Sequence, residues 1–113
     1  MVEKIYIDYL SAVFPEMPVL AERPSKPIPD TFIMIDNNGT SEENHILHST
    51  VAFQSYGRSL LDAAELNDRV IEAVKNSTTL DVVASARLNS AYNFTDTATK
   101  FYRYQAVFDI THY

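Results

Sequence analysis

Few residues of this sequence have the types and spacing that chemistry requires. The histidines are His45, His48 and His112. In a strand, His45 and His48 would point to opposite faces because side chains alternate with period two, and a tetrahedral metal site built on them would still lack two donors. We therefore interpret the histidines as polar positions on an exposed or interface strand, and we expect no metal site.

The carboxylates and serines lead to a similar expectation. Glu42 and Glu43 are adjacent in a polar stretch where nothing desolvates them, so they indicate a solvated charge cluster rather than an acid/base pair. Ser59 lacks the second glycine of a nucleophile elbow and is better explained as a helix cap. The only glycines, Gly39 and Gly57, cannot build a phosphate-cradling loop or a dinucleotide fingerprint. We expect no catalytic residue, no cofactor and no enzyme activity.

Composition sets the broad class. The 113 residues (12.8 kDa) are 46% hydrophobic, which predicts a single globular domain spanning 1–113. A net charge of -6 makes nucleic acid an unfavourable main partner. The chain has no cysteine, which excludes thiolate sites and disulfides, and no window resembles a membrane span or a cleavable leader. We expect a soluble protein that is intracellular when made, with no membrane partner.

The spacing of apolar residues predicts two helices. The first occupies the first fourteen residues and ends at Pro15; the second runs from about Ser59 to Lys75. On the solvent-exposed side of the second helix, we expect the pairs Arg58/Asp62 and Glu65/Arg69 to form ion pairs, because the members of each pair are four residues apart.

The remaining segments predict strands. The connector that carries all five prolines has room for one short edge strand at 19–22, and an apolar run follows at 31–35. The pair Asn38-Gly39 favours a tight turn at that point. Further strand patterns occupy about 47–56, 84–92 and 101–112. The predicted class is α+β, in the order α-β-β-β-α-β-β, with a mainly antiparallel sheet of four to five strands.

Two features leave alternatives open. Aromatic residues crowd the last 22 positions and serve either a small sheet core or a subunit interface, with both possible on opposite faces. The polar excursion from Asn37 to Ile46 is either a solvated hairpin tip or an arm that orders on a neighbour.

Two strings carry a family resemblance: VAFQSYGRS from Val51 to Ser59, and AAELN from Ala63 to Asn67. They resemble the small tail terminator proteins of long-tailed bacteriophages and prophages, also labelled tail completion, head-to-tail joining or minor capsid proteins. The order of segments over nearly the whole chain is similar too. The other matching segments are Glu22-Arg23-Pro24, Phe32-Ile33, Asn93 to Asp96 and Tyr102 to Gln105.

The resemblance implies a homohexameric ring that sits on the last ring of the tail tube, stops its growth and presents a surface to the filled head. Partners would be other copies of the chain, the tail tube protein and a head-tail connector protein. The location would be the virion tail, after assembly in the host cytoplasm. DNA would pass through the lumen without specific binding, past an acidic wall. The candidate contact residues are Asn37, Asn38, Glu42 and Glu43 in the polar loop, the charged rim residues Arg58, Arg87 and Arg103, and Tyr104.

Three other interpretations remain. Another ring of the head-tail neck, a stopper or adaptor, is difficult to separate from a terminator by sequence. A non-viral α+β binding module would use the aromatic sheet as a platform, and a concave aromatic pocket in a monomer would favour it. A small enzyme lacks a nucleophile, a base in an apolar setting or a cofactor motif.

Overall fold

The fold was obtained as a computed structural model that describes residues 1–99 and 101–113. Within these residues it contains two α-helices, one short 3-10 helix and five strands, and the predicted α+β class and element order are confirmed. The helices are α1 (Val2–Val13), α2 (Leu60–Lys75) and the 3-10 turn η1 (Asn76–Thr79). The strands are β1 (Val19–Leu20), β2 (Phe32–Glu43), β3 (Ile46–Gly57), β4 (Val83–Asn93) and β5 (Tyr102–His112).

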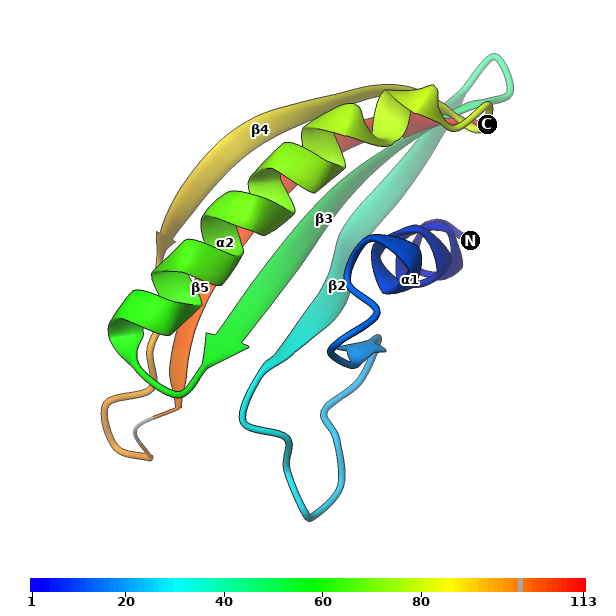
Figure 1. Ribbon diagram of the computed structural model, residues 1–113. Helices are drawn as coiled ribbons and strands as arrows, with labels where there is room; N and C mark the ends of the chain where they lie inside the picture. Colours follow the sequence, from blue (N-terminus) through cyan, green and yellow to red (C-terminus); the bar gives the residue numbers. More distant parts are fainter. Residues whose placement is uncertain (100) are drawn as a thin grey trace.

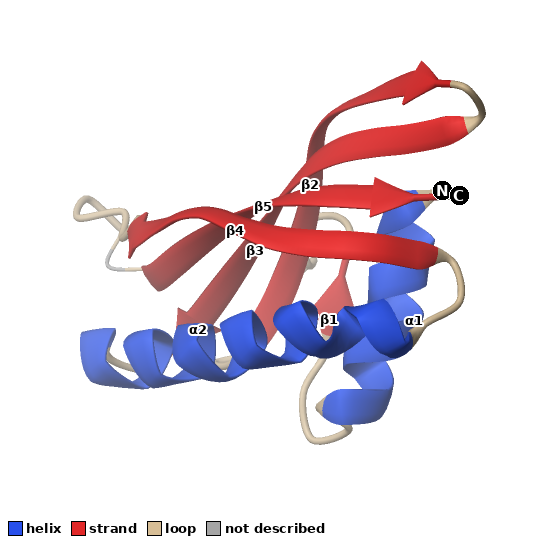
Figure 2. Ribbon diagram, turned by 90° about the horizontal axis from the view of Figure 1, so that it is seen from above, coloured by secondary structure: helices blue, strands red, loops and turns tan. Residues whose placement is uncertain are grey.

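The strands form one sheet in the order β1-β2-β3-β5-β4. Only the short pair β1/β2 is parallel; the other three pairs are antiparallel. Both helices lie on the same face of the sheet, and α2 runs along it (Figures 1 and 2). No helix of the described residues covers the opposite face, which we call the open face (Figure 2).

The core lies between the helices and the sheet. Tyr6 of α1 meets Phe53 of β3 edge to face, with ring centroids 5.2 Å apart, and Phe53 meets Phe108 of β5 at 5.8 Å. All three side chains are buried. Part of the C-terminal aromatic surplus therefore belongs to the core.

Two tyrosines of α1 hold it against the end of α2. Ser77 Oγ donates to the carbonyl of Val74 at 2.6 Å, so the hydroxyl of Tyr6 is the donor in its 2.8 Å bond to Ser77 Oγ. Burial raises the pKa of Tyr6 to about 12, which keeps this donor protonated. Tyr9 donates to the carbonyl of Ala73 at 2.7 Å.

The start of α2 depends on Ser59 and Gly57. Ser59 Oγ accepts a hydrogen bond from the amide of Asp62 at 3.1 Å, which confirms the predicted cap. Gly57 ends β3 where the helix backbone is so close that an added Cβ would lie 2.6 Å from the nitrogen of Ala63. The sharp strand-to-helix turn thus requires a residue without a side chain.

The turn predicted at Asn38-Gly39 is wrong. β2 continues to Glu43, and the reversal comes at Asn44 and His45, both with positive φ, as a two-residue hairpin turn demands. At the Asn-Gly pair the register shifts, because Asn38 is an extra residue between Asn37 and Gly39. Asn37 Oδ1 accepts from the amide of Gly39 at 3.0 Å and stabilises this bulge.

The two ion pairs predicted within α2 are replaced by other pairs. Arg58 precedes the helix and lies 3.4 Å from Asp30. Arg69 reaches Glu16 at 3.2 Å and covers the ring of Phe14 at 4.9 Å. Arg58, just before α2, and Arg69, within α2, therefore both tie the connector before β2 to this helix.

Candidate functional site

The most prominent surface feature is the far half of the β2–β3 hairpin, residues 39–50, which we call the hairpin arm. It rises away from the rest of the sheet toward the open face (Figure 2). Glu42, Glu43 and Asn44 at its end are exposed, and so is Asn38 at its base. The candidate loop residues therefore lie together, on a strand and not on a loop. A paired hairpin can reach a neighbouring molecule without first having to order itself.

A chain of side-chain hydrogen bonds fixes the base of the arm. Asn37 Nδ2 donates to Thr40 Oγ1 at 3.0 Å, Thr40 Oγ1 lies 2.8 Å from Ser49 Oγ, and Ser49 Oγ lies 2.8 Å from His112 Nε2. Asn37 also reaches Glu3 of α1 at 3.5 Å. These bonds join β2, β3, β5 and α1, so Asn37 positions the arm and is only half-exposed.

His112 is the one histidine buried among the described residues. Desolvation is the main cause that lowers its pKa; the amino terminus and His48 act in the same direction, and a backbone interaction with Tyr113 opposes them. Its Nδ1 has no hydrogen-bond partner among the described residues. Burial thus favours the neutral form of His112.

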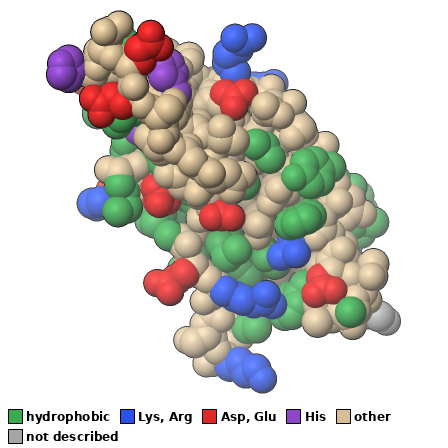
Figure 3. All heavy atoms as spheres, turned by 180° about the vertical axis from the view of Figure 1, so that it is seen from behind, with side chains coloured by type: hydrophobic (Ala, Val, Ile, Leu, Met, Phe, Trp, Pro, Cys, Tyr) green, Lys and Arg blue, Asp and Glu red, His purple; other side chains and the backbone are tan. Residues whose placement is uncertain are grey.

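Strand β4 forms the edge of the sheet opposite β1 and exposes large apolar side chains. Leu88, Tyr92 and Phe94, at or next to this strand, are 39%, 41% and 40% exposed, and Val82 before it is also exposed. Seen from behind, histidine and acidic side chains lie at the arm, charged side chains are scattered over the rest of this view, and hydrophobic ones are numerous toward the β4 side (Figure 3). A long, partly apolar edge with a single charged residue, Arg87, is typical of a surface that pairs with another chain.

Arg103 and Tyr104 lie beside this edge, and Arg103 is held from several sides. Its Nε donates to the carbonyl of Phe94 at 2.6 Å and its Nη1 to the hydroxyl of Tyr56 at 2.8 Å. Its guanidinium also covers the ring of Phe94 at 4.4 Å. Arg103 thus braces the segment after β4. Tyr104 is half-buried on the other face of β5.

The other two candidate arginines are exposed and lie apart. Arg58 is at the start of α2, paired with Asp30. Arg87 is in the middle of β4 and forms no ion pair with any described residue. The eight candidate residues therefore occupy three places: the hairpin arm and its base, the β4 side, and the α2 start.

Sequence reasoning missed Asp36 and His112 as parts of these surfaces. Asp36 is exposed on the part of β2 that leads into the arm, and His112 supports the arm from below. The signal for Asp36 was present, since it is the first polar residue after the apolar run 31–35.

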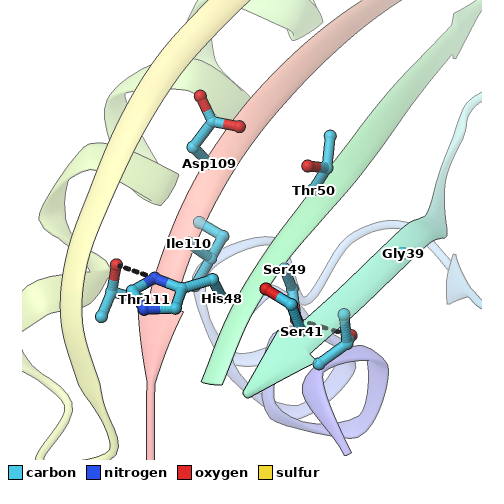
Figure 4. A pocket seen from close by; sticks show the side chains of 9 residues that line it. Gly39, Ser41, His48, Ser49, Thr50, Asp109, Ile110 and Thr111 are labelled. Carbon is cyan, nitrogen blue, oxygen red and sulfur yellow. Dashed lines mark hydrogen bonds between the residues drawn. The ribbon is translucent and has the colours of Figure 1, made fainter. Parts of the chain in front are cut away.

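Where the arm curves away, the open face has a wide polar hollow of about 460 Å³ (Figure 4). Gly39, Ser41, Thr50 and other small polar residues line it, together with His48 and Asp109. His48 Nδ1 lies 3.3 Å from Thr111 Oγ1, and Asp109 accepts from Asn89 at 3.2 Å. The two ionisable groups are thus each hydrogen-bonded to a neighbouring side chain.

Within residues 1–99 and 101–113, no three histidine or acidic side chains are arranged to hold a metal ion. Neither described helix is long and apolar enough to cross a membrane. No family model matches the chain, and no curated protein matches it.

Proposed function

We propose that this chain is a virion structural protein that closes into a ring on the end of a phage tail tube, terminates tail growth and offers the surface to which the head joins. The observation that carries the proposal is the sheet with two open edges on opposite sides and a hairpin arm projecting beside one of them. A subunit with complementary surfaces on opposite sides is suited to head-to-tail contacts around a closed ring.

The family resemblance supports the same function, since the segments that carry it lie at structurally demanding places. The string 51–59 includes the central strand β3, Gly57 at the close turn and the helix cap Ser59. The ring would be homohexameric, with the tail tube protein below it and a connector above.

The alternative binding module has less support. The aromatic hollow of the open face, lined by Phe32, Tyr56 and Phe101, measures about 210 Å³. Pockets for small molecules commonly have about 300–1,000 Å³. Phe32 and Tyr56 already stack on each other in the wall of this hollow, with ring centroids 4.2 Å apart.

Tail length tests the proposal. Tails should be imaged by electron microscopy from cells that make every virion protein except this one, and from cells complemented with the full chain or with a variant whose residues 40–47 are replaced by a tight turn. We expect tubes of uncontrolled length without the protein and with the shortened arm, and normal tails with the full chain. An exposed-surface variant of α2, Glu72→Gln, serves as the control and should restore normal length.

Two outcomes overturn this assignment. Tails of normal length that fail to join heads would indicate a stopper or adaptor ring instead. Normal, infectious particles without the protein would remove it from the virion altogether.

A further inference from the structure

The two open edges of the sheet run in opposite directions. β1 covers β2 only at Ile33 and Met34, so no described strand lies on the outer side of β2 from Ile35 to Glu43. No described strand lies on the outer side of β4 either. Because β2/β3, β3/β5 and β5/β4 are each antiparallel, β2 and β4 are antiparallel to one another. Copies placed side by side in one orientation therefore bring β4 of one beside β2 of the next in an antiparallel pairing.

The charges of the edge strands favour pairing of β4 with β2 over pairing of two identical strands. The only charged residue of β4 is Arg87, whereas β2 contains Asp36, Glu42 and Glu43 and no basic residue. Pairing β4 with β4 would bring two basic strands together, and pairing β2 with β2 would bring acidic strands together. Only β4 against β2 places opposite charges across the contact.

The register of the sheet aligns Arg87 with the middle of β2. Arg87 pairs with Asp109, Asp109 with Thr50 and Thr50 with Gly39, so Arg87 and Gly39 are level along the strands. In an unstaggered ring, Arg87 would lie beside Gly39 of the next copy, between that copy's Asp36 and its acidic arm tip. A Cβ added at Gly39 would have no described atom within 4 Å, so there is open space for a long side chain.

We propose that β4 of each copy pairs with the outer edge of the hairpin arm of the next copy, which makes one continuous sheet around the ring. This pairing rests on the proposed function, which requires a ring, and specifies the surfaces that close it. It hydrogen-bonds two exposed backbone edges, sets Arg87 among acidic side chains and covers the exposed apolar residue Leu88 of β4, which is level with Asn37.

Engineered disulfides test the pairing directly, because the chain has no cysteine. Ser41 and Ser85 are level, through His48 and Thr111, and lie on strands separated by three strand spacings, about 14 Å. That distance is too long for a bond within one chain. The full-length variant Ser41→Cys/Ser85→Cys should form disulfide-linked oligomers when oxidised. If neighbouring copies are instead shifted by two residues along the strands, the variant Ser41→Cys/Arg87→Cys should form the cross-link.

The control is Ser41→Cys/Asp68→Cys, which moves the second thiol to the exposed side of α2. The pairing is supported if either of the two strand variants forms a much larger fraction of cross-linked oligomers than the control. No excess over the control in either pair overturns it, whether light scattering shows an oligomer or only monomer. That result leaves the terminator function to be judged by tail length.

Charge exchange gives a second test. Arg87→Glu should weaken self-association about tenfold by light scattering, and adding Asp36→Arg, two ladder pairs from Gly39, should restore most of the loss. Lys75→Glu makes the same change of charge on α2 and should leave association unchanged. Equal effects of Arg87→Glu and Lys75→Glu, with no rescue, would overturn the pairing.

Discussion

Ser49 Oγ and His112 Nε2 lie 2.8 Å apart at the base of the hairpin arm, where they join β3 to β5 away from solvent. Because burial lowers the pKa of His112, we expect the stability of the fold to depend on pH. The contact is also the last link of the hydrogen-bond chain that begins at Asn37.

We predict that the protein loses stability as the pH falls below 6.5, the ordinary pKa of histidine. Burial lowers the pKa of His112 in the folded state, so the unfolded chain binds the proton more readily. The stabilising contribution is complete above the ordinary pKa and is lost progressively from there down to the lower folded pKa. Urea unfolding across this range should show a smaller decline for His112→Gln than for the parent. His45→Gln, at the exposed turn, should follow the parent; an identical decline in all three would contradict the prediction.

The two glycines should respond in opposite ways to alanine. Gly57→Ala places a Cβ against the backbone of α2 and should destabilise the fold by about 1–3 kcal/mol. Gly39→Ala meets open space and should stay within about 0.5 kcal/mol of the parent. Thermal or urea unfolding of the two variants side by side measures the difference. Equal stabilities would show that the strand-to-helix turn is looser than described.

Arginine is required at 103 for its shape as well as its charge. Arg103→Lys keeps the charge but cannot donate to both the Phe94 carbonyl and the Tyr56 hydroxyl while covering the Phe94 ring. We expect a loss of about 1–2 kcal/mol in the free energy of unfolding. The matched variant Arg87→Lys, on the exposed middle of β4, should change it by less than about 0.5 kcal/mol. A neutral Arg103→Lys would remove the bracing role.

The acidic surface predicts weak contact with DNA. Each copy carries a net charge of -6, and the arm adds Glu42 and Glu43 at its end. Phosphates passing through a ring of such subunits would be repelled rather than held. Filter binding at low salt should therefore show little retention of double-stranded DNA by the assembled protein. Tight retention that falls steeply as salt is added would contradict this expectation.

The regular elements could be predicted from sequence because their signals are local. The apolar spacing of 60–75 and the Ser59 cap fix α2, and alternation along 102–112 fixes β5. The short strand expected at 19–22 exists as Val19–Leu20.

The arm could not be predicted because two local signals competed. Asn38-Gly39 is a strong turn pair, but here it forms a bulge inside β2, whereas Asn44 and His45 adopt the positive φ angles of the real turn. The partners of Arg58 and Arg69 were missed for another reason. Asp30 and Glu16 lie in the proline-bearing connector, and only the tertiary fold brings them near α2.

The mass of the assembled particle tests the central claim most directly. The full-length protein should be added to purified, uncapped tail tubes, and the complexes released from tube ends should be weighed by native mass spectrometry. If the chain forms a ring, we expect one discrete species of six chains. Arg87→Glu should lower the amount of this species, and Lys75→Glu should not. A single chain bound at tube ends, or no binding at all, would contradict it.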